Sequence, residues 1–179
     1  MRKFNNLMEI ITHRRSVRSY IDKEVEPEKI EYLLDAFRKA PSAKNLQPWK
    51  LIIIKDKNKK ADLSIACNNQ SFIAEAPLIV AVCANEEESY HNMGGYMNSF
   101  PIDIAIALEH LMLAAVEIGL GTCWIGAFKE NLVKGILGVP ENIRVVALTP
   151  IGYPGPSAET PERGRKSISE IVCYEKYCD

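Results

Sequence analysis

The chain has 179 residues, 47% of them hydrophobic, with 22 Lys and Arg residues set against 23 Asp and Glu residues. This length and composition predict one ordinary globular domain over residues 1–179, large enough for a substantial core. The net charge of −1 and the pI of about 6.3 argue against nucleic acid as an obligatory partner. Residues 1–20 are charged and lack the apolar run of a signal peptide, so we expect a cytoplasmic protein with no membrane partner.

Hydrophobic periodicity predicts an alternation of helices and strands. A short helical pattern runs from Phe4 to Ile11, and Pro27 opens a second helix that ends near Pro41. The other expected elements are a strand at 49–54, a surface helix at 57–67, a buried strand at 77–84, a long helix at 103–118, a short helix at 132–137 and a strand at 144–151.

The expected helix at 103–118 is apolar on nearly every face, and only Asp103, Glu109, His110 and Glu117 interrupt it. A helix of this kind must be buried on all sides. It is too interrupted for a membrane span, which needs about 20 predominantly apolar residues. Two explanations stay open at this point: a central core helix in a monomer, or a helix partly covered by a partner subunit.

The C-terminal region, residues 154–179, has the composition of an arm. Pro, Gly, Ser and Thr are frequent from Pro154 to Pro161, which predicts an extended segment before a strand-like or mixed pattern at 167–174. Such an arm can reach a neighbouring subunit.

The cysteines and histidines do not indicate a metal centre. Cys67, Cys83, Cys123, Cys173 and Cys178 form an odd-numbered set without zinc-like paired spacing, and we expect all five to be reduced thiols. The three histidines are too far apart in sequence to argue a metal site or a catalytic triad.

A polar loop from Pro41 to Trp49 lies between the second helix and the first strand. Its two prolines stiffen it, and they restrict the residues before them, so that Ser42, Asn45 and Gln47 are presented by a rigid loop. Amide side chains combine donors and acceptors, as a planar heterocycle with alternating N–H and C=O edges requires. A polar connection without a ligand explains the loop about equally well.

A basic segment from His13 to Tyr20 contains Arg14, Arg15, Ser16 and Arg18. Guanidinium groups bind phosphate bidentately and a serine hydroxyl adds a donor, so the segment is a candidate site for one phosphate group. The alternatives are a solvated basic turn or a weak nucleic-acid patch, and the near-neutral charge disfavours the latter.

A glycine-rich segment from Gly119 to Phe128 follows the long helix. Its glycines suit a helix C-cap and let backbone N–H groups approach a ligand closely, and Trp124 adds a large aromatic ring. The pattern alone is weak, because a glycine cap followed by a buried tryptophan is common in protein cores.

Together, these segments resemble the FMN-dependent nitroreductase family. The order of the motifs is Arg14 to Tyr20, Pro41 to Trp49, Gly119 to Gly126, and the basic run Arg163-Gly164-Arg165-Lys166. The resemblance extends from about residue 8 to about residue 172.

The resemblance implies an α+β fold of three α/β/α layers, with a mostly antiparallel central sheet flanked by helices, in an intertwined homodimer that has FMN at the subunit interface. NADH or NADPH is the implied electron donor, and hydride passes through flavin N5 to a nitroaromatic, a quinone or a similar small acceptor in ping-pong fashion, without a catalytic side chain. At the phosphate, the implied flavin-binding residues are Arg14, Ser16 and Arg165, with Arg15 and Arg163 nearby. At the pyrimidine edge they are Arg18, Asn45, Ser42 and Gln47, and Pro41 of the same loop is also implied to contact the flavin. Trp124 and Ile125 are implied at the apolar edge, and Gly126 near N5.

Two questions stay open at the level of sequence. The chain is short for the family, and a loop at 86–100 is either a roof over the pocket, with Gly94-Gly95 for mobility, or a disordered surface loop. The binding motifs alone also fit a carrier, store or redox sensor that binds FMN without turnover.

Overall fold

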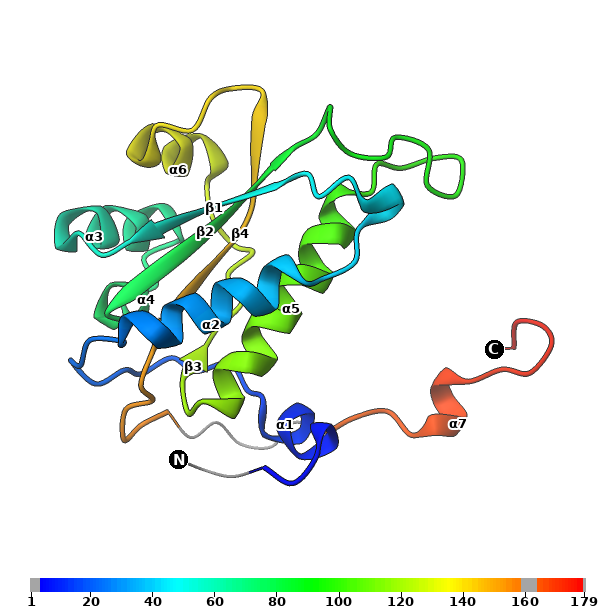
Figure 1. Ribbon diagram of the computed structural model, residues 1–179, viewed down its shortest axis with the longest axis horizontal. Coiled ribbons are helices and arrows are strands. Elements are labelled where there is room, and N and C mark those ends of the chain that lie inside the picture. The colour runs from blue at the N-terminus through cyan, green and yellow to red at the C-terminus, as the bar shows by residue number, and fades with distance from the viewer. Residues whose placement is uncertain (1–3, 159–163, 179) are drawn as a thin grey trace.

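The computed structural model describes residues 4–158 and 164–178 (Figure 1). In chain order its elements are α1 (Leu7–His13), α2 (Pro27–Arg38), the 3₁₀ helix η1 (Ala43–Asn45), β1 (Trp49–Ile54), α3 (Lys57–Ala66), α4 (Phe72–Glu75), β2 (Leu78–Asn85), α5 (Phe100–Glu117), β3 (Gly121–Thr122), α6 (Glu130–Leu137), β4 (Ile143–Gly152) and α7 (Ile168–Ile171). The predicted strand at 49–54 is confirmed, and the other predicted helices and strands up to residue 152 agree with the structure to within a few residues at either end.

The sheet has the strand order β1-β2-β4-β3, and each neighbouring pair is antiparallel. Strand β2 is central and reads as a continuous apolar run because both of its faces are buried. Its residues alternate between two clusters, with Val80 and Val82 in one and Ile79 and Ala81 in the other. The mostly antiparallel sheet that the resemblance implies is confirmed.

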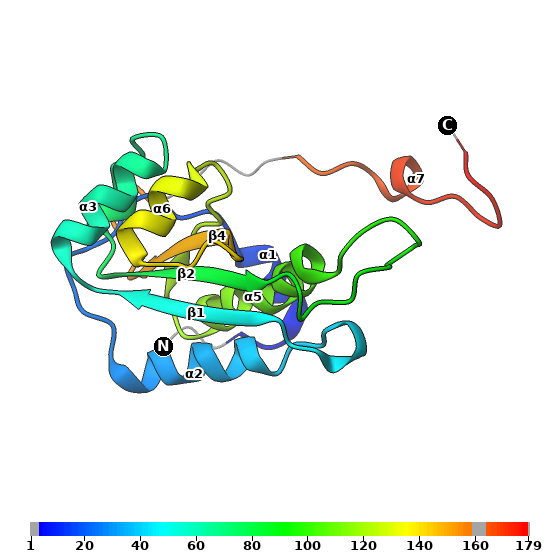
Figure 2. The same cartoon turned by 90° about the horizontal axis from the view of Figure 1, so that it is seen from above.

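Helices cover both faces of this sheet (Figure 2). The cluster that contains Val80 and Val82 packs against α2 and α5, including Phe37 and Leu108. The opposite cluster packs against α3, α4 and α6, including Leu63. The result is the expected three-layer α+β arrangement.

Helix α5 is buried on one side only in this chain. Ile104, Leu108 and Leu111 are fully buried against the sheet and α2, whereas Ile102 and Ile106 are exposed. Helix α1 packs against α5 and contains no buried residue, which leaves three apolar side chains exposed. We call the exposed residues of these two helices the open apolar face; they are Leu7, Met8, Ile11, Ile102 and Ile106.

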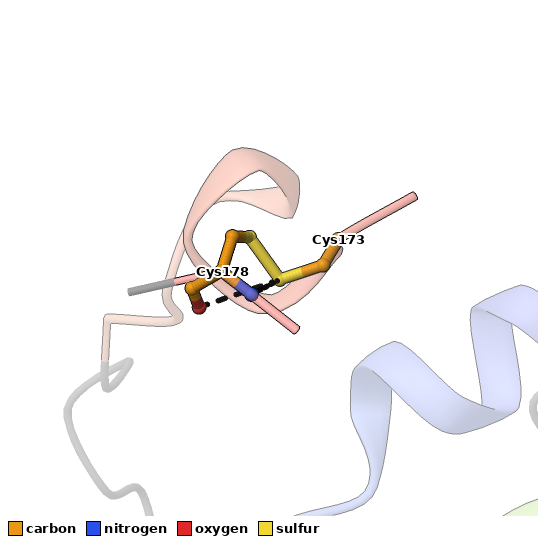
Figure 3. The surroundings of a disulfide bond; sticks show 2 residues. All are labelled: Cys173 and Cys178. Atoms are coloured by element: carbon orange, nitrogen blue, oxygen red, sulfur yellow. Dashed lines mark hydrogen bonds between the residues drawn. A yellow bond between two sulfur atoms is a disulfide. The ribbon is translucent and has the colours of Figure 1, made fainter. Parts of the chain in front are cut away.

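The C-terminal arm, residues 164–178, extends away from the body (Figures 1 and 2). All of its residues are exposed, and it contains the single helical turn of α7, where Ser167 and Glu170 form a capping box, rather than a strand. A disulfide joins Cys173 and Cys178 (Figure 3). The expectation of five reduced thiols is therefore wrong for this pair.

The three remaining cysteines, Cys67, Cys83 and Cys123, are free, as expected, and the structure buries them. The closely spaced pair in the arm bonds because the chain turns back on itself there, which cysteine spacing alone does not reveal. Within the described residues, no helix is both long and apolar enough to cross a membrane.

Candidate functional site

The basic segment, residues 14–20, lies along β3. Ser16 and Thr122 form a parallel bridge, and the backbone N–H of Val17 donates to the carbonyl oxygen of Thr122 at 2.9 Å. A Cβ atom at Gly121 would lie 2.8 Å from the side chain of Val17, so only glycine permits this close approach. The buried hydroxyl of Tyr20 donates to the carbonyl oxygen of Val17 at 2.9 Å and closes the turn.

The other side of the basic segment is held by the chain that follows β4. The N–H of Gly155 donates to the carbonyl oxygen of Ser19 at 2.8 Å, and the Ser157 hydroxyl lies 2.8 Å from that of Ser19. A segment that is fixed on both sides presents its arginines from a defined backbone, which a surface turn without such bonds would not do.

Arg14 follows directly after α1 and reaches α5. Its Nε atom lies 3.4 Å from Oε1 of Glu109. Burial raises the pKa of the Glu109 carboxyl, and the positive charge of Arg14 opposes that rise. Because the ion pair uses Nε, the two terminal nitrogen atoms of the guanidinium group can still donate to an anion.

Arg15 and Arg18 are exposed, and in residues 4–158 and 164–178 neither has a carboxylate partner within salt-bridge distance. The guanidinium carbon of Arg18 lies 6.0 Å from the centroid of the Phe72 ring. The basic segment thus combines one paired and two unpaired guanidinium groups with the half-buried Ser16.

The glycine-rich segment forms a short loop beside the basic segment. Gly119 has a φ of +79° and ends α5, as its position predicts. Trp124 is 38% exposed and lies between two anchored residues, Cys123 and Ile125, whose side chains are buried. A Cβ atom at Gly126 would lie 3.3 Å from Nε1 of Trp124, so glycine lets the exposed backbone lie close to the indole.

The side chain of Ile125 lies in the core, where it does not face a ligand. Its side chain is 2% exposed and belongs to the core, and its backbone N–H and C=O both pair with Leu148. The structure therefore gives Ile125 the role of holding Trp124 and Gly126 on either side of it.

Cys123 lies between the two segments without the features of a nucleophile. Burial raises the pKa of its thiol, and this outweighs the opposing influence of Arg18, of a hydrogen bond with Ser16 and of Arg14. A thiol whose pKa is raised is a poor nucleophile near neutral pH. Its contacts in the core support a packing role.

The polar loop, residues 41–48, is anchored to the first turn of α5. The N–H of Ala43 donates to Oδ1 of Asp103 at 2.8 Å, and the other oxygen of this buried carboxylate accepts from the Ser99 hydroxyl at 2.7 Å. Within the loop, the N–H of Gln47 donates to the Ser42 hydroxyl oxygen at 3.0 Å. These bonds fix the backbone of the loop, and the rigidity that its prolines predict stays a prediction.

This loop has an unusual backbone. Lys44, Asn45 and Gln47 have φ values of 52°, 58° and 51°, in the left-handed region that side chains rarely adopt. Strain of this kind costs of the order of 1–3 kcal/mol for each residue and concentrates at ligand sites. The conformation leaves the side chains of Asn45 and Gln47 exposed.

The segment between β2 and α5 is an ordered hairpin rather than a disordered loop. Met93 and Met97 form an antiparallel bridge around Gly94 and Gly95, whose φ values are 61° and 81°. The N–H of Tyr90 donates to the Ser99 hydroxyl oxygen at 3.0 Å. The ring of Tyr90 also lies 4.4 Å from Nζ of Lys44, so that the hairpin contacts the polar loop.

The structure brings together two of the three predicted clusters. The basic segment meets the glycine-rich segment 119–128, which we call the tryptophan loop from here on, near the C-terminal end of α5, whereas the polar loop is bonded to the first turn of that helix. Helix α5 has 18 residues, so at a rise of about 1.5 Å per residue its axis is roughly 27 Å long. The basic segment and the polar loop, whose Arg18 and Asn45 were expected to face the same ligand edge, thus lie toward opposite ends of α5 within one chain (Figure 1).

The fourth basic motif is described only in part. Arg163 lies outside the described residues, and Arg165 is exposed at the start of the C-terminal arm. Arg165 also makes an interaction within this chain.

Sequence reasoning missed several residues that build the site. Asp103 and Glu109 were noted only as interruptions of an apolar helix, yet the first anchors the polar loop and the second pairs with Arg14. Carboxylates in an otherwise apolar helix were the available signal, since a buried charge needs a partner. Thr122 was also missed: its buried hydroxyl has no hydrogen-bond partner in the described part of the chain.

Comparison with known proteins identifies the family. The model of the nitroreductase family matches residues 11–78 and 61–153. An FMN reductase (NADPH) of Bacillus subtilis is 29% identical over an alignment that covers 98% of this chain and 77% of that protein. Iodotyrosine deiodinase 1 of Mus musculus is 25% identical, with 92% of this chain and 67% of that protein covered.

Among solved structures, a nitroreductase family protein from Clostridium difficile 630 is 34% identical to this chain and superimposes with a TM-score of 0.86. The match covers 97% of this chain and 100% of that one. The chain belongs to the nitroreductase family, as the order of its motifs predicts.

Proposed function

We propose that the protein is an FMN-dependent oxidoreductase that takes hydride from NADH or NADPH and reduces an electron-poor small molecule in a ping-pong cycle. A nitroaromatic or a quinone is the acceptor class we expect. One observation carries the proposal: a doubly anchored arginine segment lies against a loop with an exposed tryptophan, in a chain related to an FMN reductase (NADPH).

The residues present fit FMN. Its phosphate is a dianion, and the guanidinium groups of Arg14 and Arg15 with the Ser16 hydroxyl form a matching set of donors, while Arg18 of the same segment is left for the pyrimidine edge. Its isoalloxazine ring needs close backbone approach at one place, which Gly126 permits beside Trp124. The buried Thr122 hydroxyl, which has no hydrogen-bond partner among the residues that the structure describes, lies next to Ser16 and is a further polar group at this place.

The chain's residues hold and orient in this proposal. The basic segment fixes the phosphate end, and Arg165 with Arg163 extends this positive charge. The exposed face of Trp124 packs against the apolar edge of the ring. In the polar loop, Pro41, Ser42, Asn45 and Gln47 bind the pyrimidine edge. When bound, FMN supplies the redox chemistry by accepting hydride and passing electrons to the acceptor.

The binding site is proposed to form between two copies of the chain. Within one chain, Asp103 holds the polar loop and Glu109 pairs with Arg14. The six residues between these anchors advance α5 by only about 9 Å but turn it by about 240°, so the two groups lie on different faces of the helix, and we infer that one flavin does not contact both in the same chain. A two-fold arrangement that buries the open apolar face would bring the polar loop of one copy to the basic segment of the other. The C-terminal arm, with Ile168 and Ile171 uncovered in this chain, would pack on the partner.

Domain organisation and compartment belong to the same proposal. We infer one nitroreductase-like domain over residues 1–179 with a C-terminal arm at 154–179. The start of this arm is bonded to the basic segment of its own chain, and its later part, 164–178, is the part that would reach the partner. The cytoplasmic location stays a prediction.

Flavin analysis tests the cofactor first. Protein purified with added FMN and FAD should release FMN on heating. Arg14→Ala should weaken FMN binding by roughly 1.5–3 kcal/mol, about 10- to 150-fold, because hydrogen bonds to a charged group are lost. Arg38→Ala is the matched control, since Arg38 is exposed at the end of α2 and pairs with Asp35. Retention of FAD, or equal FMN affinity in both variants, would contradict the site.

Anaerobic mixing with NADH or NADPH then separates the enzyme from a carrier. Loss of flavin absorbance followed by reoxidation with a quinone is the expected result, with parallel double-reciprocal plots in steady state. A bound FMN that neither nucleotide reduces would instead indicate a carrier, store or sensor.

A further inference from the structure

The disulfide in the C-terminal arm lies in an unusual place for a structural crosslink. Cys173 and Cys178 are five positions apart and both are exposed. The bond connects nothing in the body of the protein, so it fixes only the end of the arm (Figure 3). The disulfide therefore constrains only the shape of the arm itself.

The disulfide closes a loop that presents two aromatic rings. Tyr174 and Tyr177 lie inside the loop and are 84% and 88% exposed. Glu175, between them, has a φ of 69°, a left-handed conformation that an unconstrained glutamate rarely adopts. The closed ring holds this turn, and with it the spacing of the two tyrosines.

We propose that Cys173 and Cys178 form a reversible dithiol/disulfide pair, open to exchange with low-molecular-weight thiols, that controls how firmly the arm docks on a second copy of the chain. The docking part rests on the proposed homodimer. The exchange part stands on the exposed pair alone and takes place on the undocked arm.

The exchange balances as an ordinary two-electron reduction. A thiolate of the reductant attacks Sγ of Cys178, the bond to Cys173 breaks, and a mixed disulfide forms while Cys173 leaves as a thiolate and takes up a proton. The N–H of Cys178 donates to Sγ of Cys173 at 3.0 Å, which stabilises charge on that sulfur and favours it as the leaving group. A second reductant thiol then releases Cys178, so that two thiols become one external disulfide.

The other cysteines are protected from the same chemistry. Burial raises the pKa of the Cys67 and Cys83 thiols to about 11 and also raises that of Cys123. Thiolates, not thiols, carry out exchange, and these three sulfur atoms are buried as well. Thiol reagents should therefore act on the arm first.

Reduction should weaken docking because it removes preorganisation. In the oxidised arm, the turn at Glu175 and the two tyrosines are already ordered before they meet a partner. In the reduced arm, this loop is flexible when the arm is undocked, and ordering it on docking costs conformational entropy. We expect the dimer dissociation constant to rise roughly tenfold on reduction. This corresponds to only part of the free energy that closing such a short loop with a disulfide can contribute.

The experiment uses the full-length protein in mixtures of reduced and oxidised glutathione. Alkylation with N-ethylmaleimide in denaturant, read by mass spectrometry, should give three adducts in oxidised protein and five in reduced protein. Sedimentation velocity over a dilution series then gives the dimer dissociation constant of each form.

Two variants keep the outcomes distinct. The double variant Cys173→Ser/Cys178→Ser should match the reduced form and ignore glutathione. The double variant Tyr174→Ser/Tyr177→Ser keeps the disulfide and should associate weakly in both redox states.

Five adducts under oxidising conditions, or a disulfide that glutathione never opens, would overturn the exchange. Equal dissociation constants for the oxidised and reduced forms would overturn the control of docking. A monomer in every state would overturn the homodimer and the docking together, while the adduct count would still decide the exchange.

Discussion

The buried carboxylate of Asp103 should determine both the stability of the chain and the shape of the polar loop. Its two oxygens accept from the N–H of Ala43 and from the Ser99 hydroxyl, at 2.8 and 2.7 Å. Ser99 also accepts from the N–H of Tyr90 at 3.0 Å. A single side chain on α5 thus connects the polar loop with the hairpin that precedes the helix.

Asp103→Ala removes both acceptors and leaves two donors without partners. Hydrogen bonds to a charged group contribute about 1.5–3 kcal/mol each. Water can reach the half-buried Ala43 and compensate part of one bond, so we expect a loss of about 3 kcal/mol in the free energy of unfolding. Asp103→Asn keeps one carbonyl oxygen as an acceptor in the same shape, and its loss should be about half as large.

Urea denaturation at one fixed protein concentration measures these losses, and FMN titration measures the effect on the loop. Both variants should bind FMN more weakly because the loop backbone, with its left-handed residues, loses its anchor. Asp62→Ala is the control, since Asp62 is an exposed carboxylate on α3, across the sheet. Unfolding free energies within 1 kcal/mol of the control, or a stability loss without any change in FMN affinity, would refute this reasoning.

Two further predictions concern packing and charge. Gly121→Ala should lower the free energy of unfolding by roughly 1–3 kcal/mol and reduce FMN affinity, because the added carbon lies 2.8 Å from the side chain of Val17. Gly135→Ala is the control: no atom lies within 4 Å of its added carbon, so this variant should be as stable as wild type or more stable. Equal losses of stability in the two variants would count against the close approach of Gly121 and Val17. Glu130→Gln should cost about 1–2 kcal/mol at pH 7, because Arg144 and the N–H of Val145 hold the pKa of the Glu130 carboxyl below its ordinary value of 4.5. This contribution is present above pH 4.5 and is lost as the pH falls through the lowered pKa of Glu130. In urea unfolding, the difference in the free energy of unfolding between wild type and variant should therefore disappear in acid. A difference that persists in acid would exclude the carboxylate as its source.

Local patterns in the sequence predict most of the fold because its elements agree with their own propensities. Strand β2 is an unbroken apolar run, and the structure buries both of its faces. Helix α2 begins at a proline and has its apolar residues at helical spacing, and it ends where Pro41 approaches. For such elements, burial and local chemistry favour the same conformation.

The sequence predicts the members of the site better than their arrangement. Its motifs identify the basic segment, the polar loop and the tryptophan loop, but not that α5 separates the polar loop from the other two. Distance across a fold depends on which elements pack together, and no spacing along the chain encodes it. The disulfide was missed for a related reason, since Cys173 and Cys178 meet through a tight turn at Glu175 that has no glycine to mark it.

Helix α5 fixes the distance between the basic segment and the polar loop. Asp103 in its first turn holds the polar loop, and Glu109, about two turns later, holds Arg14. One helix therefore sets the distance between the two groups of residues that we propose to bind the ligand, and its exposed Ile102 and Ile106 lie on the face left open in this chain. If a second copy packs on that face, the two helices set the dimensions of both binding sites at once, and any substitution that tilts α5 must alter subunit contact and ligand affinity together.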